Sequence, residues 1–599
     1  MYILSRVIRR ITTFLVLFLA VLIINPTWSS NPDTALDDYV TAPDPNFNYT
    51  LVAPPAMGDG YLLYVFYMSS QQWRSEGEVD RTIWTHWLAM IVPTAMTTNS
   101  AMLIIAGGDN FEPPDLGAAE VAIAAEIAKS SGSVVSVIGQ IPNQPLFFPD
   151  EPYAHSEDEL VAYSFDKALD TGDWYWPVYL PMTKASVRAM DTIQIVTSNP
   201  AVAPIPVSQF VVTGFSKRGA ITWLTGVVDP RVRAIAPGVF DILNMDDQVE
   251  HHYSAYGFYS DALDDFVNYN VLRRVRTPEG QALMQVVDPI SYKERLDMPK
   301  FILNSSGDRF FASDSARFYF DELEGENLIR YVANTGHTLE TEPDNIEDAI
   351  TSLVSWYLNV IYDLPRPQIS WQLVDGYLEV QTDRPAYARF WQAHNPTARD
   401  FRLETIGRTW SSVPLSFLPQ VTYTVPVPEP DEGWTAYFVD LTYPSLIEGL
   451  PPQTYSTSIF ISPDTLPFEV SDPLLDPRGV GFWKRQVAVA QGARGRAQVP
   501  IDVLAGYFPI PLFDQYVMNI EDAANVFAAP NRDPQARARK QCLALRLNVR
   551  DGQLGWYTSL TIGDDESKKL WEHYTEAHEA FLEGDPKAAK AICATVNEI

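Results

Sequence analysis

The sequence predicts an α/β protein whose central sheet is mostly parallel and is covered by helices on both faces. Short apolar runs lack the polar–apolar alternation of half-exposed strands, as is typical of strands buried on both faces. These runs lie at 60–68, 84–92, 102–106, 133–138, 210–212 and 233–236. Helical patterns at 116–130 and 183–195 are interleaved with them. Because parallel strands need long crossovers, this alternation favours one large parallel sheet.

The strand expected at 210–212 runs into Gly214-Phe215-Ser216-Lys217-Arg218-Gly219, and a helical segment follows at 220–228. A serine on a sharp strand-to-helix turn is a nucleophile elbow. The turn lifts the hydroxyl away from the backbone, and the helix N-terminus favours negative charge beside it. The usual spacing is G-x-S-x-G, whereas the second glycine here comes one residue later. The segment therefore indicates Ser216 as a candidate nucleophile.

Two later strands end at an acid and a base. The apolar run 300–304 leads to Asp308, and the run 328–332 leads to His337. Ser, Asp and His in this chain order, each after a strand, form the triad order of α/β-hydrolases. Asp314 is the alternative acid, in a Ser- and Asp-rich loop that could instead cap a helix. We therefore predict an α/β-hydrolase fold with Ser216, Asp308 and His337 as catalytic residues.

The loop after 102–106 is rich in glycine and is the expected partner of the elbow. A backbone N–H of Gly108 or Asp109, together with that of Lys217, would form the oxyanion hole. Basic side chains directly after the serine, here Lys217 and Arg218, are unusual. Such a cation could bind a substrate carboxylate or stabilise the oxyanion, and we predict that Arg218 binds substrate. The alternative is that one of the two basic side chains pairs with an acid.

Several longer blocks resemble the PhoPQ-activated pathogenicity-related protein family. They lie at 180–191, 214–219, 223–232, 307–311 and 334–337. The resemblance spans roughly residues 40–465 and implies an exported α/β-hydrolase followed by a β-rich domain. It implies no particular substrate, and it does not extend to residues 470–599.

The composition excludes some partners. A net charge of −32 disfavours nucleic acid and anionic membrane surfaces, because both would repel the chain. The sequence has no phosphate-binding loop and no metal-binding histidine spacing, so it implies no cofactor and no metal. The expected partner is a small-molecule or polymer ester substrate, and the oligomeric state stays open.

Residues 1–30 are predicted to be a signal peptide or a signal anchor. Three arginines precede the apolar run 11–24, and small residues follow it. Fourteen residues are short for a membrane span and suit a signal peptide. We therefore expect a secreted or periplasmic protein, with a single N-terminal anchor as the alternative. In an exported protein, Cys542 and Cys593 could form one disulfide, or they could remain separate buried thiols.

The rest of the chain divides into three parts. The hydrolase domain is expected at 31–365, and its segment 241–299 has the position of a cap insertion. Alternating residues around Asp375-Gly376 indicate a β-hairpin, so we expect a small antiparallel β-sandwich at 366–468. The boundary at Pro365 is expected to carry few contacts, so that a protease would release a folded hydrolase domain. Residues 469–599 are partly helical and have no predicted role.

Together these features predict an exported serine hydrolase that cleaves an ester through a Ser216 acyl-enzyme. A peptidase is the second interpretation, because it would use the same triad and oxyanion hole. A non-catalytic exported binding or signalling module on the hydrolase fold is the third, and the loss of a triad residue would favour it.

Overall fold

The computed structural model describes residues 31–110, 112, 119–151, 153–339, 343–447, 450, 452–468, 477–560, 562 and 568–598. The segment 1–30, with the predicted signal peptide or anchor, lies outside the described residues. Within the described part of the chain, no helix is long and apolar enough to cross a membrane.

The central sheet has the strand order of an α/β-hydrolase, which confirms the predicted fold class. Its order is β3-β4-β6-β5-β7-β8-β9-β10, with β4 antiparallel to both of its neighbours and the strands from β6 to β10 parallel. The strands are β3 (Tyr61–Gln72), β4 (Ile83–Pro93), β5 (Ser100–Ile105), β6 (Val134–Ile138), β7 (Gln209–Phe215), β8 (Val232–Gly238), β9 (Lys300–Ser305) and β10 (Asn327–Val332). Two short strands, β1 (Asn48–Leu51) and β2 (Ala56–Gly58), pair with β3.

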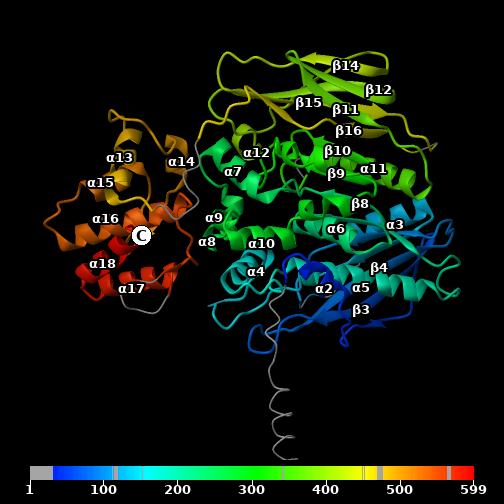
Figure 1. Cartoon of the computed structure of the whole chain (residues 1–599), viewed down its shortest axis with the longest axis horizontal. Coiled ribbons are helices and arrows are strands. Elements are labelled where there is room, and N and C mark those ends of the chain that lie inside the picture. The colour runs from blue at the N-terminus through cyan, green and yellow to red at the C-terminus, as the bar shows by residue number, and fades with distance from the viewer. Residues whose placement is uncertain are drawn as a thin grey trace, which may run out of the picture.

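Helices cover both faces of this sheet, as predicted (Figure 1). Side chains of α5 (Tyr179–Thr197) and α6 (Lys217–Val228) share one core, which α2 (Ala35–Thr41) also joins. Side chains of α3 (Ala119–Ser131) and α11 (Pro343–Ile361) belong to the other core. Five further helices lie near the carboxyl ends of the strands: α4 (Glu157–Thr171), α7 (Met245–Tyr256), α8 (Asp264–Asn268), α9 (Val271–Arg274) and α10 (Pro278–Val287). We call residues 241–299, which include α7 to α10, the cap.

The β-rich part is built around one long strand, β12 (Tyr377–Asn395), which changes partners along its length. Its first half pairs with β11 (Ile369–Val374) and β14 (Gln420–Pro426), and its second half pairs with β13 (Ser411–Pro414) and β15 (Trp434–Tyr443). The turn between β11 and β12 has positive φ angles of 47° at Asp375 and 79° at Gly376, as the Asp-Gly hairpin pattern requires.

This part continues the hydrolase sheet and is not loosely linked to it. Strand β16 (Gln453–Ser456) pairs with β10, and the Tyr331 N–H donates to Ser456 Oγ at 2.9 Å. Arg366 donates to Glu326 Oε1 at 2.6 Å across the same boundary. The expectation of few contacts near Pro365 is therefore wrong, because strand pairing and an ion pair both bridge it. A second short strand, β17 (Phe460–Ser462), pairs with β15.

Residues 477–598 form a mainly helical unit with its own apolar core, which we call the C-terminal unit. Figure 1 shows it beside cap helices α8 and α9. Its helices are α13 (Val480–Ala490), α14 (Ile501–Gly506), α15 (Ile520–Ala528), α16 (Pro534–Arg550), α17 (Leu570–Leu582) and α18 (Pro586–Val596). Two small two-stranded antiparallel sheets belong to it: β18 (Ile510–Leu512) with β19 (Gln515–Val517), and β20 (Ser559–Leu560) with β21 (Lys568–Lys569).

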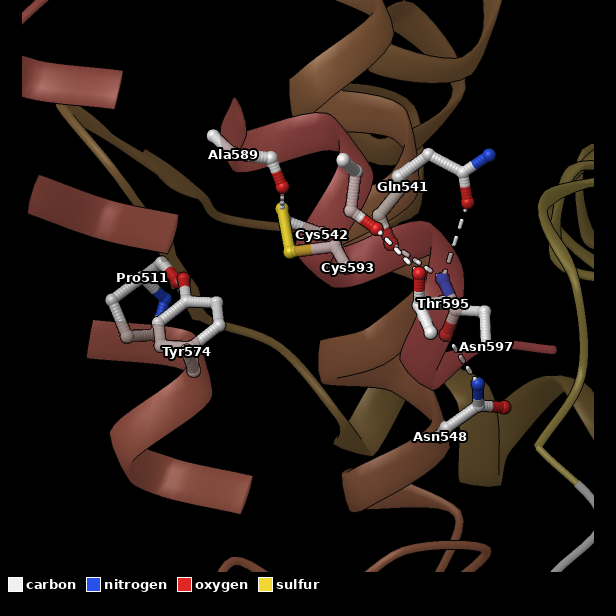
Figure 2. Close-up of a disulfide and its surroundings, with 10 residues drawn as sticks. Pro511, Gln541, Cys542, Asn548, Tyr574, Ala589, Cys593, Thr595 and Asn597 are labelled. Atoms are coloured by element: carbon white, nitrogen blue, oxygen red, sulfur yellow. Dashed lines mark hydrogen bonds between the residues drawn. A yellow bond between two sulfur atoms is a disulfide. The ribbon is translucent and has the colours of Figure 1, made fainter. Parts of the chain in front are cut away.

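A disulfide joins two helices of the C-terminal unit, which settles the alternatives left open for its cysteines. Cys542 on α16 and Cys593 on α18 form an S–S bond of 2.01 Å (Figure 2). Asn597 just after α18 donates to the Gln541 carbonyl at 2.8 Å and accepts from Asn548 Nδ2 at 2.9 Å. The C-terminal end of α18 is thus fixed to α16 by both a covalent bond and hydrogen bonds.

Candidate active site

The glycine spacing around Ser216 is explained by the packing of the elbow. Ser216 has φ 57° and ψ −129°, a region that non-glycine residues rarely adopt. A Cβ at Gly214 would lie 2.7 Å from the Arg218 carbonyl oxygen, and one at Gly219 would lie 2.8 Å from the Gly238 carbonyl oxygen. Since neither backbone position leaves room for a side chain, both glycines are required. The later second glycine of this sequence is the one that packs against β8.

The structure brings the three predicted catalytic residues together. His337 Nε2 lies 2.8 Å from Ser216 Oγ, and His337 Nδ1 lies 2.8 Å from Asp308 Oδ2. Because a carboxylate only accepts hydrogen bonds, Nδ1 carries the proton and Nε2 is free to accept from the serine hydroxyl. Asp308 is buried and also accepts from the Phe310 N–H at 2.8 Å. This arrangement has the geometry of a Ser–His–Asp triad.

Asp314, the alternative acid, lies in a different cluster. Its carboxylate bonds to His251 Nε2 at 2.9 Å and to Arg399 Nη2 at 2.7 Å. Burial alone would raise the pKa of Asp314, but Arg399 and His251 hold that pKa well below its usual value. Of the two acids, Asp308 is therefore the one that is hydrogen-bonded to His337.

The two basic side chains after the serine both pair with acids. Lys217 Nζ lies 2.6 Å from Glu157 Oε2 and 3.1 Å from Asp158 Oδ1. Arg218 donates to both oxygens of Glu157, at 2.6 and 2.9 Å, and to the Ile141 carbonyl at 2.5 Å. The predicted binding of a substrate carboxylate by Arg218 does not fit this geometry, because Glu157 already occupies its guanidinium.

Glu157 is a site residue that the sequence did not reveal. It begins α4, with a positive φ of 51°, and bonds through its backbone N–H to Gln144 Oε1 at 2.8 Å. Burial raises the pKa of Glu157, but the charges and hydrogen bonds of Arg218 and Lys217 lower that pKa to about 2. The carboxylate is therefore ionised at neutral pH and neutralises the cations beside the nucleophile.

The glycine-rich loop is held in shape by Gln140, which the sequence also did not reveal. The Gln140 N–H donates to the Gly107 carbonyl at 2.8 Å, and its side-chain amide donates to the Asp109 carbonyl at 2.9 Å. Among the described residues, the N–H groups of Gly108, Asp109 and Lys217 have no acceptor. These are the donors expected for the oxyanion hole, and they remain available to a ligand.

Arg218 also contacts this loop. A Cβ at Gly107 would lie 2.6 Å from Arg218 Nη2, so the guanidinium packs directly against the loop backbone. The ion pair with Glu157 thus fixes the residue that supports the loop.

An apolar cavity of about 80 Å³ opens beside Ser216. Most of its wall comes from the cap, through Ile242, Met245, Val249, Leu263, Phe266, Val271, Leu272, Val275 and Met284. Phe165 on α4, Tyr179 on α5 and Phe240, Phe310 and Phe311 form most of the rest, and Asp158 and Lys217 also line the cavity beside Ser216. The segment 241–299 therefore shapes the space next to the candidate nucleophile.

A buried acid lies at the start of the cap. The hydroxyls of Tyr319 and Tyr331 each donate to Asp241 at 2.6 Å, and burial raises the pKa of Asp241 to about 7. Across the described residues, no three His, Cys, Asp or Glu side chains are grouped so as to hold a metal ion.

The strand order, the elbow and the Ser–His–Asp contacts define a protein of the α/β-hydrolase fold class. The model of the PhoPQ-activated pathogenicity-related protein family matches residues 36–402. The chain is also 34% identical over 463 residues to Autocrine proliferation repressor protein A of Dictyostelium discoideum, covering 73% of this chain and 92% of that protein. The chain belongs to the PhoPQ-activated pathogenicity-related protein family, as its sequence blocks predicted.

Solved structures with a similar fold include two acetyl xylan esterases. The enzyme of Thermoanaerobacterium sp. JW/SL YS485 is 14% identical, with a TM-score of 0.38 over 55% of this chain and 94% of that chain. The enzyme of Paenibacillus sp. R4 is 15% identical, with a TM-score of 0.38 over 55% of this chain and 95% of that one.

Proposed function

We propose that this protein is a serine hydrolase that cleaves a carboxylic ester through an acyl-enzyme on Ser216. The observation that supports it is the continuous chain of contacts from Ser216 Oγ through His337 to Asp308, at 2.8 Å in each step. A serine hydroxyl is a weak nucleophile at neutral pH unless a base takes its proton, and His337 Nε2 is in place to do so.

In the proposed reaction, Ser216 Oγ attacks the ester carbonyl while its proton moves to His337 Nε2. The carbonyl oxygen becomes an oxyanion that accepts from the Lys217 N–H and from the N–H of Gly108 or Asp109. The C–O bond then breaks, and His337 returns the proton to the leaving alkoxide, which departs as an alcohol. Water repeats the sequence on the acyl-enzyme and releases the acid. Asp308 accepts from Nδ1 throughout and stabilises the imidazolium.

The apolar cavity beside Ser216 supports a small uncharged acyl group. Its volume of about 80 Å³ suits a short chain, and its wall is almost wholly aliphatic and aromatic. A peptidase would use the same residues, so the nature of the bond must be tested directly. The contact between Ser216 and His337 favours both enzymatic readings over a non-catalytic module.

Export from the cytoplasm is part of the proposal. The bond between Cys542 and Cys593 supports it, because structural disulfides persist in oxidising compartments. Mass spectrometry of the N-terminus of the protein from its native host would test it. A mature start near residue 30 is the expected result, and recovery of the whole chain from the cytosolic fraction would contradict it.

The enzymatic proposal is tested by labelling with a fluorophosphonate and then by a panel of p-nitrophenyl esters and aminoacyl amides. We expect the label on Ser216 and turnover that is greatest for short acyl chains. Ser216→Ala should lose both, with an unchanged thermal midpoint, since triad removal costs about four to six orders of magnitude in kcat. Ser198→Ala, which changes an exposed serine after α5, is the matched control. Equal turnover by the two variants would refute the assignment, and turnover of amides alone would replace esterase with peptidase.

A further inference from the structure

A second cavity, of about 260 Å³, lies where the C-terminal unit meets the hydrolase part. Aromatic side chains from both sides line it. Tyr153 and Tyr269 come from the hydrolase part, and Trp556, Tyr557 and Trp571 come from the C-terminal unit. The Tyr269 and Tyr557 rings stack with their centroids 4.0 Å apart. The cavity therefore exists only while the two parts are docked.

Glu159, Asp265 and Asn268 complete the lining, and none of its described residues is a lysine, arginine or histidine. Glu159 accepts from the Tyr153 hydroxyl at 2.9 Å and lies 3.2 Å from His155 Nδ1. Among the described residues, the Asp265 carboxylate has no hydrogen-bond or ion-pair partner. Burial, and then the nearby charges of Glu159 and Asp158, raise the pKa of Asp265 to about 6. Lys217 partly offsets this effect, but it is bound to Glu157 and Asp158 and does not line the cavity. The described lining thus carries two acids and no cationic side chain.

Arg546 and Lys569 lie beside residues of the lining but do not line the cavity themselves. The Arg546 guanidinium lies 4.8 Å from the Trp556 ring centroid and 5.2 Å from that of Tyr574, and it does not line the cavity. Lys569 donates to Asp166 at 3.1 Å. A cation bound in the cavity would add the positive charge that its lining lacks.

We propose that this cavity binds an organic cation of the alkylated ammonium class. Aromatic faces attract a cation through their quadrupoles, and they also favour the methyl groups that such a cation carries. A small hydrated metal ion would gain little from aromatic walls, whereas a neutral ligand would leave the Asp265 charge unpaired. The site does not use Ser216, so it stands apart from the proposed esterase activity. Helices α4 and α8 lie between the two cavities, since Asp158 and Phe266 line one and Glu159 and Asp265 line the other.

The test is isothermal titration calorimetry of the full chain at constant ionic strength, with choline and with its neutral isostere 3,3-dimethylbutan-1-ol. We expect saturable binding of choline, and at least tenfold weaker binding of the isostere because it lacks the charge. Tetramethylammonium chloride serves as a second cationic probe. If neither cation binds, or if the isostere binds as tightly as choline, the proposal is wrong. Saturable binding of a neutral sugar such as xylobiose without binding of either cation would also overturn it.

Variants locate the site. Asp265→Asn should weaken choline binding at least tenfold, and Trp571→Leu should do the same. Asp431→Asn, which changes an exposed acid in the loop between β14 and β15, should leave binding unchanged. Ser216→Ala should also leave choline binding unchanged, so failure of the esterase proposal would be visible separately. The comparison of choline with its isostere needs no variant, so it decides the proposal even if Trp571→Leu fails to fold.

Discussion

Replacing Glu157 with glutamine removes the one carboxylate that neutralises both cations beside the nucleophile. Lys217 and Arg218 are 6% and 12% exposed. In the variant Arg218 loses its acidic partner, and Lys217 keeps only Asp158 among the described acids. Removing one member of a buried ion pair is usually costly, because the remaining charge stays desolvated. We therefore expect Glu157→Gln to lower the free energy of unfolding.

The size of this effect follows from the lowered pKa of Glu157. A pKa of about 2, against 4.5 for a free glutamate, corresponds to roughly 3.4 kcal/mol at 1.36 kcal/mol for each tenfold change. Since 43% of the Glu157 side chain is exposed, solvent screening reduces this to about 2 kcal/mol. The contribution is fully present above pH 4.5 and is lost as the pH falls towards 2, because protonation of the folded state then abolishes the ion pair.

The measurement is urea denaturation of wild type and Glu157→Gln at intervals from pH 7 to pH 3. The two stabilities should differ by about 2 kcal/mol at pH 7 and converge below pH 4.5. Glu126→Gln is the control, because Glu126 is 75% exposed and pairs only with Lys129 on the same helix, so little change is expected. A stability difference that does not depend on pH would refute the electrostatic reasoning.

The same variant should slow the proposed reaction. Arg218 packs against Gly107, and without Glu157 it is held only by the Ile141 carbonyl. A displaced guanidinium would disturb the loop of Gly108 and Asp109, so kcat should fall by at least tenfold while KM changes little.

Three further outcomes are expected. Asp308→Asn should lower kcat by about 10⁴, because the histidine tautomer is lost. Asp314→Asn should mainly lower the thermal midpoint, because buried Arg399 keeps only its 3.8 Å ion pair with Asp464 among the described acids. A reversed ranking of the two variants in ester turnover would reassign the acid. Joint replacement of Cys542 and Cys593 by alanine should cost about 4 kcal/mol for a loop of 51 residues, and an unchanged calorimetric midpoint would count against a structural role for the bond. Asp241 keeps its proton in the folded state up to about pH 7, whereas in the unfolded chain it loses that proton near pH 4. The free energy of unfolding should therefore fall as the pH rises from about 4 to 7. Asp241→Asn should remove this fall in urea denaturation at a series of pH values, and parallel curves for the two proteins would contradict the reasoning.

The sequence was sufficient for the parts of the fold that local patterns encode. Buried strands, their helices and the Gly214–Gly219 elbow follow from residue types at short spacing, and so does the hairpin at Asp375-Gly376. Some element boundaries depend on contacts that residue types at short spacing do not encode. Helix α15 begins at Ile520 because the Asn519 side chain accepts from the Asp522 N–H, and Val517 belongs to β19. Strand β16 pairs with both β10 and β15, whereas β17 follows four residues later and pairs with β15.

The remaining features depend on contacts between distant segments. Glu157 lies 60 residues before Lys217, and no spacing rule links them. Gln140 acts through its contacts with Gly107 and Asp109, which become neighbours only when β5 and β6 pair. The pairing of Arg218 with Glu157 could not be predicted for the same reason, since a basic residue beside a serine gives no sign of a distant acid. The pairing of β16 with β10 joins residues more than a hundred positions apart.

That pairing of β16 with β10 bears on how shortened versions of this protein would behave. Strand β10 is the last parallel strand of the hydrolase sheet, and β16 pairs with it on its outer side at Ile329 and Ser456. A chain ended at residue 402, where the family match stops, retains Ser216, Asp308 and His337 but loses β16. Its bare sheet edge would offer unpaired N–H and C=O groups to other copies, which is a common route to aggregation. Loss of activity on such truncation would therefore report insolubility of the chain and would say nothing about its chemistry.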